Sequence, residues 1–73
     1  MTNPDQIKGE YHKVIQHLLS DQPDIFQKFE EFWRVGEYRK ASLIANDAIR
    51  ELQLKLSPEQ MKVDEDFYLV FVN

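Results

Sequence analysis

The sequence predicts a mainly α-helical single domain over residues 1–73, and three observations support that prediction. Over most of the chain, apolar residues recur at intervals of three and four, which is the spacing of one helix face. Prolines and a glycine stand where this spacing breaks, as helix start and stop signals do. The chain has 73 residues and no cysteine, so it is too short for two cores and has no disulfide to hold a loop-rich fold.

Three helices are predicted from these stripes and from the residues that cap them. The first extends from about 4 to 19, with Asn3 as the N-cap and a proline in the first turn. The second begins at Pro23 and ends at Gly36, because glycine adopts the left-handed conformation that terminates helices. The third extends from about 37 to 55, and small residues in its stripe let another helix approach closely. The side chains expected at the core are Ile15, Leu18, Phe29, Trp33, Ala41, Ala48 and Leu52.

The last quarter of the chain predicts a helical turn followed by a strand-like segment. Ser57, Pro58 and Gln60 form a helix start with a capping box. The acidic run that follows loses the helical spacing, so only a short helical turn is expected near 58–62. Residues 67–72 are apolar throughout and rich in aromatic and β-branched side chains, which predicts a strand-like segment. Periodicity alone does not distinguish such a run from a buried helix.

The predicted second and third helices resemble the second half of a tetratricopeptide repeat. The run Gly36-Glu37-Tyr38-Arg39-Lys40-Ala41, with Ala48 one heptad after its last residue, carries the resemblance, which covers about residues 23–52. It implies an antiparallel helical hairpin and a protein-binding role. The chain departs from the family at Phe29, where a glycine is usual, and at Ala45, where a larger residue is usual. Only one copy is present, whereas such units stack in arrays of about three or more, and any tight helical hairpin favours similar residues.

The charge balance and the length of the apolar runs limit the classes of partner that we expect. The net charge is −4, without the basic footprint that phosphate backbones require, so direct nucleic-acid binding is not expected. The longest apolar run is far shorter than the roughly 20 residues that span a bilayer, and the chain starts without a leader pattern. We therefore expect no membrane span and a cytoplasmic location. A core of this size supplies only about 3–5 kcal/mol, so a homodimer is an alternative source of stability.

No residue pattern predicts catalysis, a metal or a cofactor. His12 and His17 are five residues apart, so a helix turns them away from each other, and we expect both to face solvent. Two glycines are too few for a phosphate-binding loop, and no Ser–His–acid set is indicated. The acidic pair Glu30-Glu31 is expected to be solvated. These features predict a protein that is not an enzyme.

The C-terminal segment is the predicted interaction site. Residues 67–72 contain no charge and no proline, so an exposed strand there would aggregate. The segment must be covered by the helices, by a second copy or by a partner's sheet edge. The acidic residues before it would form a rim that suits a basic partner. The predicted partner-binding residues are Asp64, Glu65, Asp66, Phe67, Tyr68, Leu69, Val70, Phe71 and Val72.

Two functions follow from this site. The favoured one is a small adaptor or regulatory module that binds a protein partner or itself. The alternative is an inhibitor or antitoxin-like protein that blocks an enzyme or a nucleic-acid-binding protein with its acidic C-terminal segment. The adaptor should fold by itself, and the three helices are expected to close a core without residues 66–73. The antitoxin-like tail should order only on binding.

Overall fold

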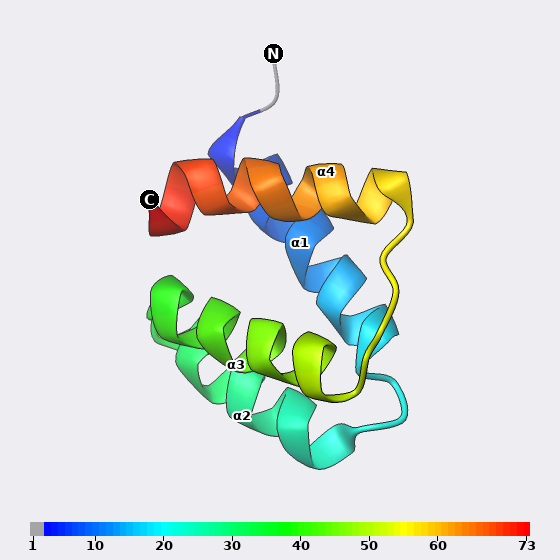
Figure 1. Ribbon diagram of the computed structural model, residues 1–73. Coiled ribbons are helices and arrows are strands. Elements are labelled where there is room, and N and C mark those ends of the chain that lie inside the picture. Colours follow the sequence, from blue (N-terminus) through cyan, green and yellow to red (C-terminus); the bar gives the residue numbers. More distant parts are fainter. Residues whose placement is uncertain (1–2) are drawn as a thin grey trace.

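Residues 3–73, which the computed structural model describes, form four α-helices and a wider helical segment, with no strand. The helices are α1 (Pro4–Leu18), α2 (Pro23–Arg34), α3 (Tyr38–Glu51) and α4 (Pro58–Phe67), and η1 (Tyr68–Val72) continues α4 as a π-helix. α2 and α3 pack side by side as an antiparallel hairpin, whereas α4 packs across α1 (Figure 1). The mainly helical class is confirmed, and the first and last helices are neighbours in space.

Two of the predicted helix starts, those of α1 and α4, are held by side-chain caps. The Asn3 Oδ1 atom accepts a hydrogen bond from the Gln6 amide at 2.8 Å and so caps α1. At α4 the Ser57 hydroxyl accepts from the Gln60 amide at 3.2 Å, and the Gln60 side chain accepts from the Ser57 amide at 2.8 Å. This reciprocal pair is the predicted capping box, and it satisfies two amides that a helix start leaves free.

The turn between α2 and α3 confirms the role predicted for Gly36. Its φ angle is +82°, in the left-handed region that glycine adopts without steric cost. The Glu37 amide beyond it donates to the Phe32 carbonyl at 2.9 Å, which closes the end of α2. Small side chains then let α3 lie close to α2, as predicted. The buried ones are Ala41, Ser42, Ala45 and Ala48.

Most of the expected core residues are covered, with one exception. Of the seven side chains predicted for the core, four are buried and two are partly buried. The buried ones are Ile15, Phe29, Ala41 and Ala48, and the partly buried ones are Leu18 and Trp33. The prediction for Leu52 is wrong, because its side chain is 40% exposed. α3 ends at Glu51, a turn earlier than predicted, and Gln53 takes a φ of +53° in the place where a glycine is usual.

Both detailed predictions for the C-terminal quarter are wrong. The helical turn expected near 58–62 is a ten-residue helix, and the segment 67–72 is π-helical instead of strand-like. A row of residues four apart, Val63, Phe67 and Phe71, packs on the core, while Glu65 between them is exposed. Burying that row outweighs the local strand preference of the apolar run, as tertiary packing commonly does.

The wider turn of η1 decides which of its side chains are buried. The Asn73 amide donates to the Tyr68 carbonyl, five residues earlier, at 2.8 Å. Each residue of a π-helix advances by a smaller angle than in an α-helix, so Val72 stays on the buried side with Phe71. The Arg39 guanidinium at the start of α3 donates to the Val72 carbonyl at 3.1 Å. This bond ties the end of η1 to the α2–α3 hairpin.

Aromatic rings join the two helix pairs at the centre of the domain. Tyr11 of α1 and Phe67 of α4 are both fully buried and stacked. Trp33 of α2 lies against both, with centroid distances of 5.9 Å to Tyr11 and 5.5 Å to Phe67. The expectation that three helices close a core without residues 66–73 is therefore wrong, because Phe67 occupies the middle of it.

Candidate functional site

The predicted interaction segment has a buried side and an exposed side. Three of its six apolar side chains pack in the core: Phe67, Phe71 and Val72. The other three are exposed: Tyr68 (43%), Leu69 (65%) and Val70 (47%). Only this second group is accessible to a partner, so the helical conformation halves the surface that the sequence assigned to binding.

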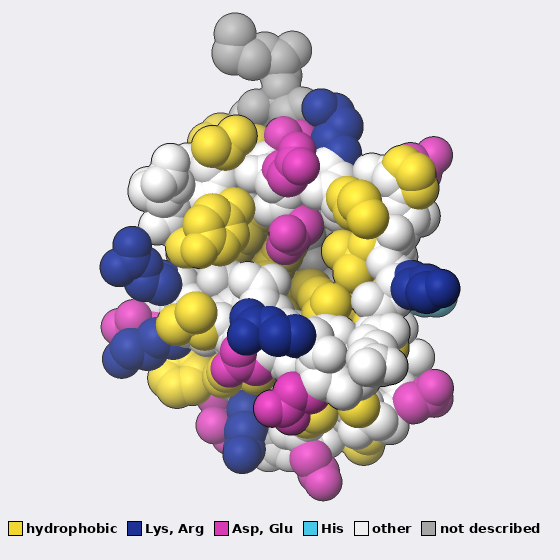
Figure 2. Space-filling model, viewed as in Figure 1, with side chains coloured by type: hydrophobic (Ala, Val, Ile, Leu, Met, Phe, Trp, Pro, Cys, Tyr) yellow, Lys and Arg dark blue, Asp and Glu magenta, His cyan; other side chains and the backbone are white. Residues whose placement is uncertain are grey.

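Met61 extends the exposed side back along α4. Its side chain is 53% exposed, and it precedes Tyr68 and Leu69 by seven and eight residues, which is two helical turns. Glu65 lies between them on the same side, four residues after Met61. In the upper part of Figure 2, acidic side chains lie between hydrophobic ones along α4. Met61 and Glu65 of α4, with Tyr68 and Leu69 of its continuation η1, form a surface that we refer to as the outer face of α4.

Asp64 lies at the edge of the outer face with a partly buried carboxyl group. Together with Glu65, Tyr68 and Leu69 it lines an open hollow. Burial raises the pKa of Asp64, and the neighbouring Glu65 carboxylate raises that pKa further. None of the ion pairs formed within residues 3–73 includes Asp64 or Glu65. The hollow thus combines two carboxylates with two apolar side chains.

Asp66 does not line this hollow. It is two residues after Asp64, and a helix turns by about 200° over two residues. The three consecutive acidic residues predicted to form one rim are therefore divided between different sides of α4. Asp64 and Glu65 alone supply negative charge to the hollow.

The charge of Asp64 also reaches the core. The hydroxyl group of Tyr11 is buried and has no hydrogen-bond partner among the described residues. Burial raises the pKa of Tyr11 far above its ordinary value, and the charge of Asp64 raises that pKa further.

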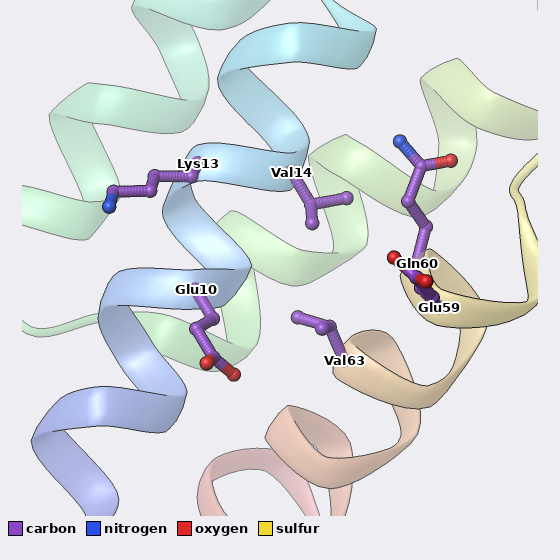
Figure 3. Close-up of a pocket in the computed structure, with 6 residues that line it drawn as sticks. All are labelled: Glu10, Lys13, Val14, Glu59, Gln60 and Val63. Atoms are coloured by element: carbon purple, nitrogen blue, oxygen red, sulfur yellow. The ribbon is translucent and has the colours of Figure 1, made fainter.

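A second hollow lies between α1 and α4 (Figure 3). Val14 and Val63 point into the space between the helices, whereas Lys13 points away from it. Both valines pack against the core and help to hold α4 on α1. Two exposed carboxylates, Glu10 and Glu59, lie at its sides. We interpret this hollow as a seam between packed helices.

The surroundings of His12 are a feature that the sequence analysis missed. The ring is partly buried, within 5.9 Å of the ring centroids of Phe26 and Phe29, and its Nε2 atom is hydrogen-bonded to the Glu30 carboxylate. The predictions that His12 faces solvent and that Glu30 is solvated are wrong, because α2 lays its aromatic side against this part of α1. His17 is exposed, as predicted.

That His12 and Glu30 stand at the edges of packed helix faces could have been predicted from the residues that precede them in the sequence. His12 directly follows Tyr11 and Glu30 directly follows Phe29, and both of these aromatic residues are fully buried. A polar residue next to the centre of a helix stripe stands at the edge of the packed face, where it meets a neighbouring helix. The second oxygen of Glu30 lies 3.6 Å from the Nε atom of the exposed Arg34.

Within residues 3–73, no three side chains of the metal-binding types gather in one place. The helices of this part of the chain are all too short or too polar to cross a membrane. Comparison of the chain with protein-family models, with curated proteins and with solved structures found no match. The proposals below rest on the geometry of the chain's own residues.

Proposed function

We propose that this chain is a small protein–protein interaction module, an adaptor or regulator without chemistry of its own, which binds through the outer face of α4. The observation that carries the proposal is the concentration of exposed apolar side chains on one helical segment. Of the seven large apolar side chains exposed within residues 3–73, three belong to the outer face, namely Met61, Tyr68 and Leu69, and a fourth, Val70, is the next residue in the chain. Scattered exposed apolar residues are ordinary on protein surfaces, whereas a cluster on one face is typical of an interaction site.

The support behind this face favours an adaptor over the antitoxin-like alternative. The opposite side of the segment is anchored in the core by Phe67 and tied to α3 by the bond from Arg39. A face held in this way loses little conformational entropy when a partner binds. The alternative requires an acidic tail that orders only on binding, and α4 instead packs on α1.

The tetratricopeptide resemblance is a separate proposal that concerns α2 and α3 alone. The antiparallel arrangement and the left-handed turn at Gly36 are in keeping with it. The same features serve any closely packed helical pair, and a single hairpin has no stacked repeats beside it. We therefore assign partner binding to α4 and not to the hairpin.

A matched pair of variants tests the proposed function. Leu69→Ser removes an exposed leucine side chain from the outer face, and Leu43→Ser removes an exposed leucine side chain from α3. Tagged wild-type and variant proteins would capture partners from the cells that make the chain, with quantification by mass spectrometry. We expect a partner that wild type and Leu43→Ser retain and that Leu69→Ser loses by about tenfold or more. Equal capture by both variants contradicts the proposal.

A further inference from the structure

The outer face of α4 has apolar ends and an acidic middle. Met61 lies at one end and Leu69 at the other, with Glu65 halfway between them and Asp64 at its edge. Lys62, the cation nearest in sequence, forms no ion pair with either carboxylate. The partly buried carboxyl group of Asp64 loses part of its hydration and also faces the like charge of Glu65. A cation in the hollow would offset both effects.

We propose that the outer face of α4 binds a basic amphipathic segment of another protein, which places one Lys or Arg side chain in the hollow between Asp64 and Glu65. The apolar stem of that side chain lies along Leu69, and its charged end is within reach of both carboxylates. The ring of Tyr68 supplies an aromatic face that also attracts a cation. Apolar residues on either side of the basic residue then cover Met61 and Tyr68. The inference rests on the proposed interaction function and names its partner class.

The arrangement of charge argues against a second copy of this chain as the occupant. A two-fold pairing that places Met61 of one copy on Leu69 of the other puts the axis at Glu65, because residue 65 is midway between them. The two Glu65 carboxylates would then meet at the centre of an apolar contact, where like charges are unfavourable. The net charge of −4 on each copy adds long-range repulsion. For a basic partner, both the contact at Glu65 and the long-range interaction between the two proteins are attractive.

Site-specific photo-crosslinking tests the proposal on the full chain. A photoreactive residue at position 62, which is exposed and next to the outer face, would be activated in extracts of the cells that make the protein. Position 43 on α3 is the matched control site. We expect the cross-linked peptide to come from another protein and to carry Lys or Arg between apolar residues. The yield should fall as the salt concentration rises from about 50 to about 300 mM.

Two charge reversals then separate a local contact from long-range attraction. Glu65→Lys and Asp66→Lys change the net charge equally, but only Glu65 lies on the outer face. We expect Glu65→Lys to lower the yield about tenfold or more and Asp66→Lys to lower it by less than about twofold. Circular dichroism would verify that both variants are folded.

The results of these experiments distinguish a failure of this inference from a failure of the proposed function on which it rests. A cross-link to another copy of the chain, or to a segment without basic residues, overturns the inference and leaves the interaction function standing. Equal effects of the two charge reversals also overturn it. If position 62 gives no more cross-linking than position 43, both the inference and the proposed function fail.

Discussion

The ring of Phe67 lies parallel to the ring of Tyr11, with the centroids 3.9 Å apart and an angle of 6° between the planes. Tyr11 belongs to α1 and Phe67 is the last residue of α4, so this one contact joins the two end helices. Neither side chain is exposed. The segment that presents the outer face is therefore also part of the core.

Replacing one residue on each side of this segment should change the stability by very different amounts. Phe67→Ala removes a fully buried ring and should lower the free energy of unfolding by about 3–5 kcal/mol, which is comparable with the whole stability of a domain this small. Leu69→Ala on the exposed side should change it by less than about 0.5 kcal/mol. Urea denaturation followed by circular dichroism measures both changes. Similar losses for the two variants would contradict the division into a core side and an outer side.

The hydroxyl group of Tyr11 should reduce stability. It is buried and has no hydrogen-bond partner among the described residues, and an unpaired buried polar group costs about 1–3 kcal/mol. Tyr11→Phe keeps the stacked ring and should raise the free energy of unfolding by about 1 kcal/mol. Tyr68→Phe, which removes an exposed hydroxyl, is the control and should have little effect. A less stable Tyr11→Phe variant would show that the hydroxyl makes a bond that contributes to the fold.

The features that the sequence predicted well are those set by neighbouring residues. Asn3 and Ser57 cap their helices through residues three positions away, and Gly36 turns the chain through its own φ angle. Such signals depend on a few consecutive residues, so they can be recognised in the sequence without knowledge of the fold. The helical class followed from them.

The errors concern features that depend on distant parts of the chain. The run 67–72 has the composition of a strand, but Phe67 is drawn into a helix by its contact with Tyr11, which is 56 positions earlier. The sequence alone does not separate the outward side of residues 64–72 from the buried side, because the outward direction of Leu69 depends on the phase of α4 and on the wider turn of η1. The contact of His12 with Glu30 depends on how α2 docks on α1, which no local pattern specifies.

The two glycines should respond to alanine in opposite directions. An added Cβ atom meets no other atom within 4 Å at Gly9 or at Gly36, so only the backbone conformation distinguishes them. Gly36→Ala places a side chain at a φ of +82° and should lower the free energy of unfolding by about 1–2 kcal/mol. Gly9→Ala lies inside α1 and should raise it by about 0.5–1 kcal/mol. Thermal denaturation of both variants checks the signs, and a stabilised Gly36→Ala variant would mean that α2 and α3 do not turn at this residue.

Neutralising Asp64 should stabilise the fold in a pH-dependent way. Burial and the Glu65 carboxylate hold the pKa of Asp64 above its usual value of 3.8. The folded chain therefore keeps this proton to a higher pH than the unfolded chain does, so ionisation of Asp64 disfavours folding. The penalty is fully present above the raised pKa and disappears as the pH falls below the usual one.

The measurement is the difference in melting temperature between Asp64→Asn and wild type from pH 7 down to about pH 3. We expect the variant to melt higher at pH 7 and the difference to shrink as the pH falls. Asp21→Asn, at an exposed position in the turn between α1 and α2, changes the net charge equally and is the control. A pH-independent difference, or the same profile for Asp21→Asn, would mean that the environment of Asp64 is not responsible.

Glu30 contacts two side chains that differ in burial, His12 and Arg34, and this allows an internal comparison. Its side chain is 19% exposed, that of His12 is 27% exposed, and that of Arg34 is 77% exposed. Water screens the pair with Arg34, whereas the pair with His12 lies beside the rings of Phe26 and Phe29. An exposed ion pair contributes about 0–1 kcal/mol, and a hydrogen bond to a charged group in a shielded place contributes about 1.5–3 kcal/mol.

Double-mutant cycles at pH 7 with His12→Ala, Arg34→Ala and Glu30→Ala should therefore give unequal coupling energies. We expect a coupling of about 1.5 kcal/mol between His12 and Glu30 and of less than about 0.5 kcal/mol between Arg34 and Glu30, from urea denaturation of the single and double variants. Both cycles use the same Glu30→Ala variant, so the effect of losing Glu30 itself is the same in each. If the two couplings are equal, the His12–Glu30 contact adds nothing beyond surface electrostatics, and the docking of α2 on α1 rests on the aromatic rings alone.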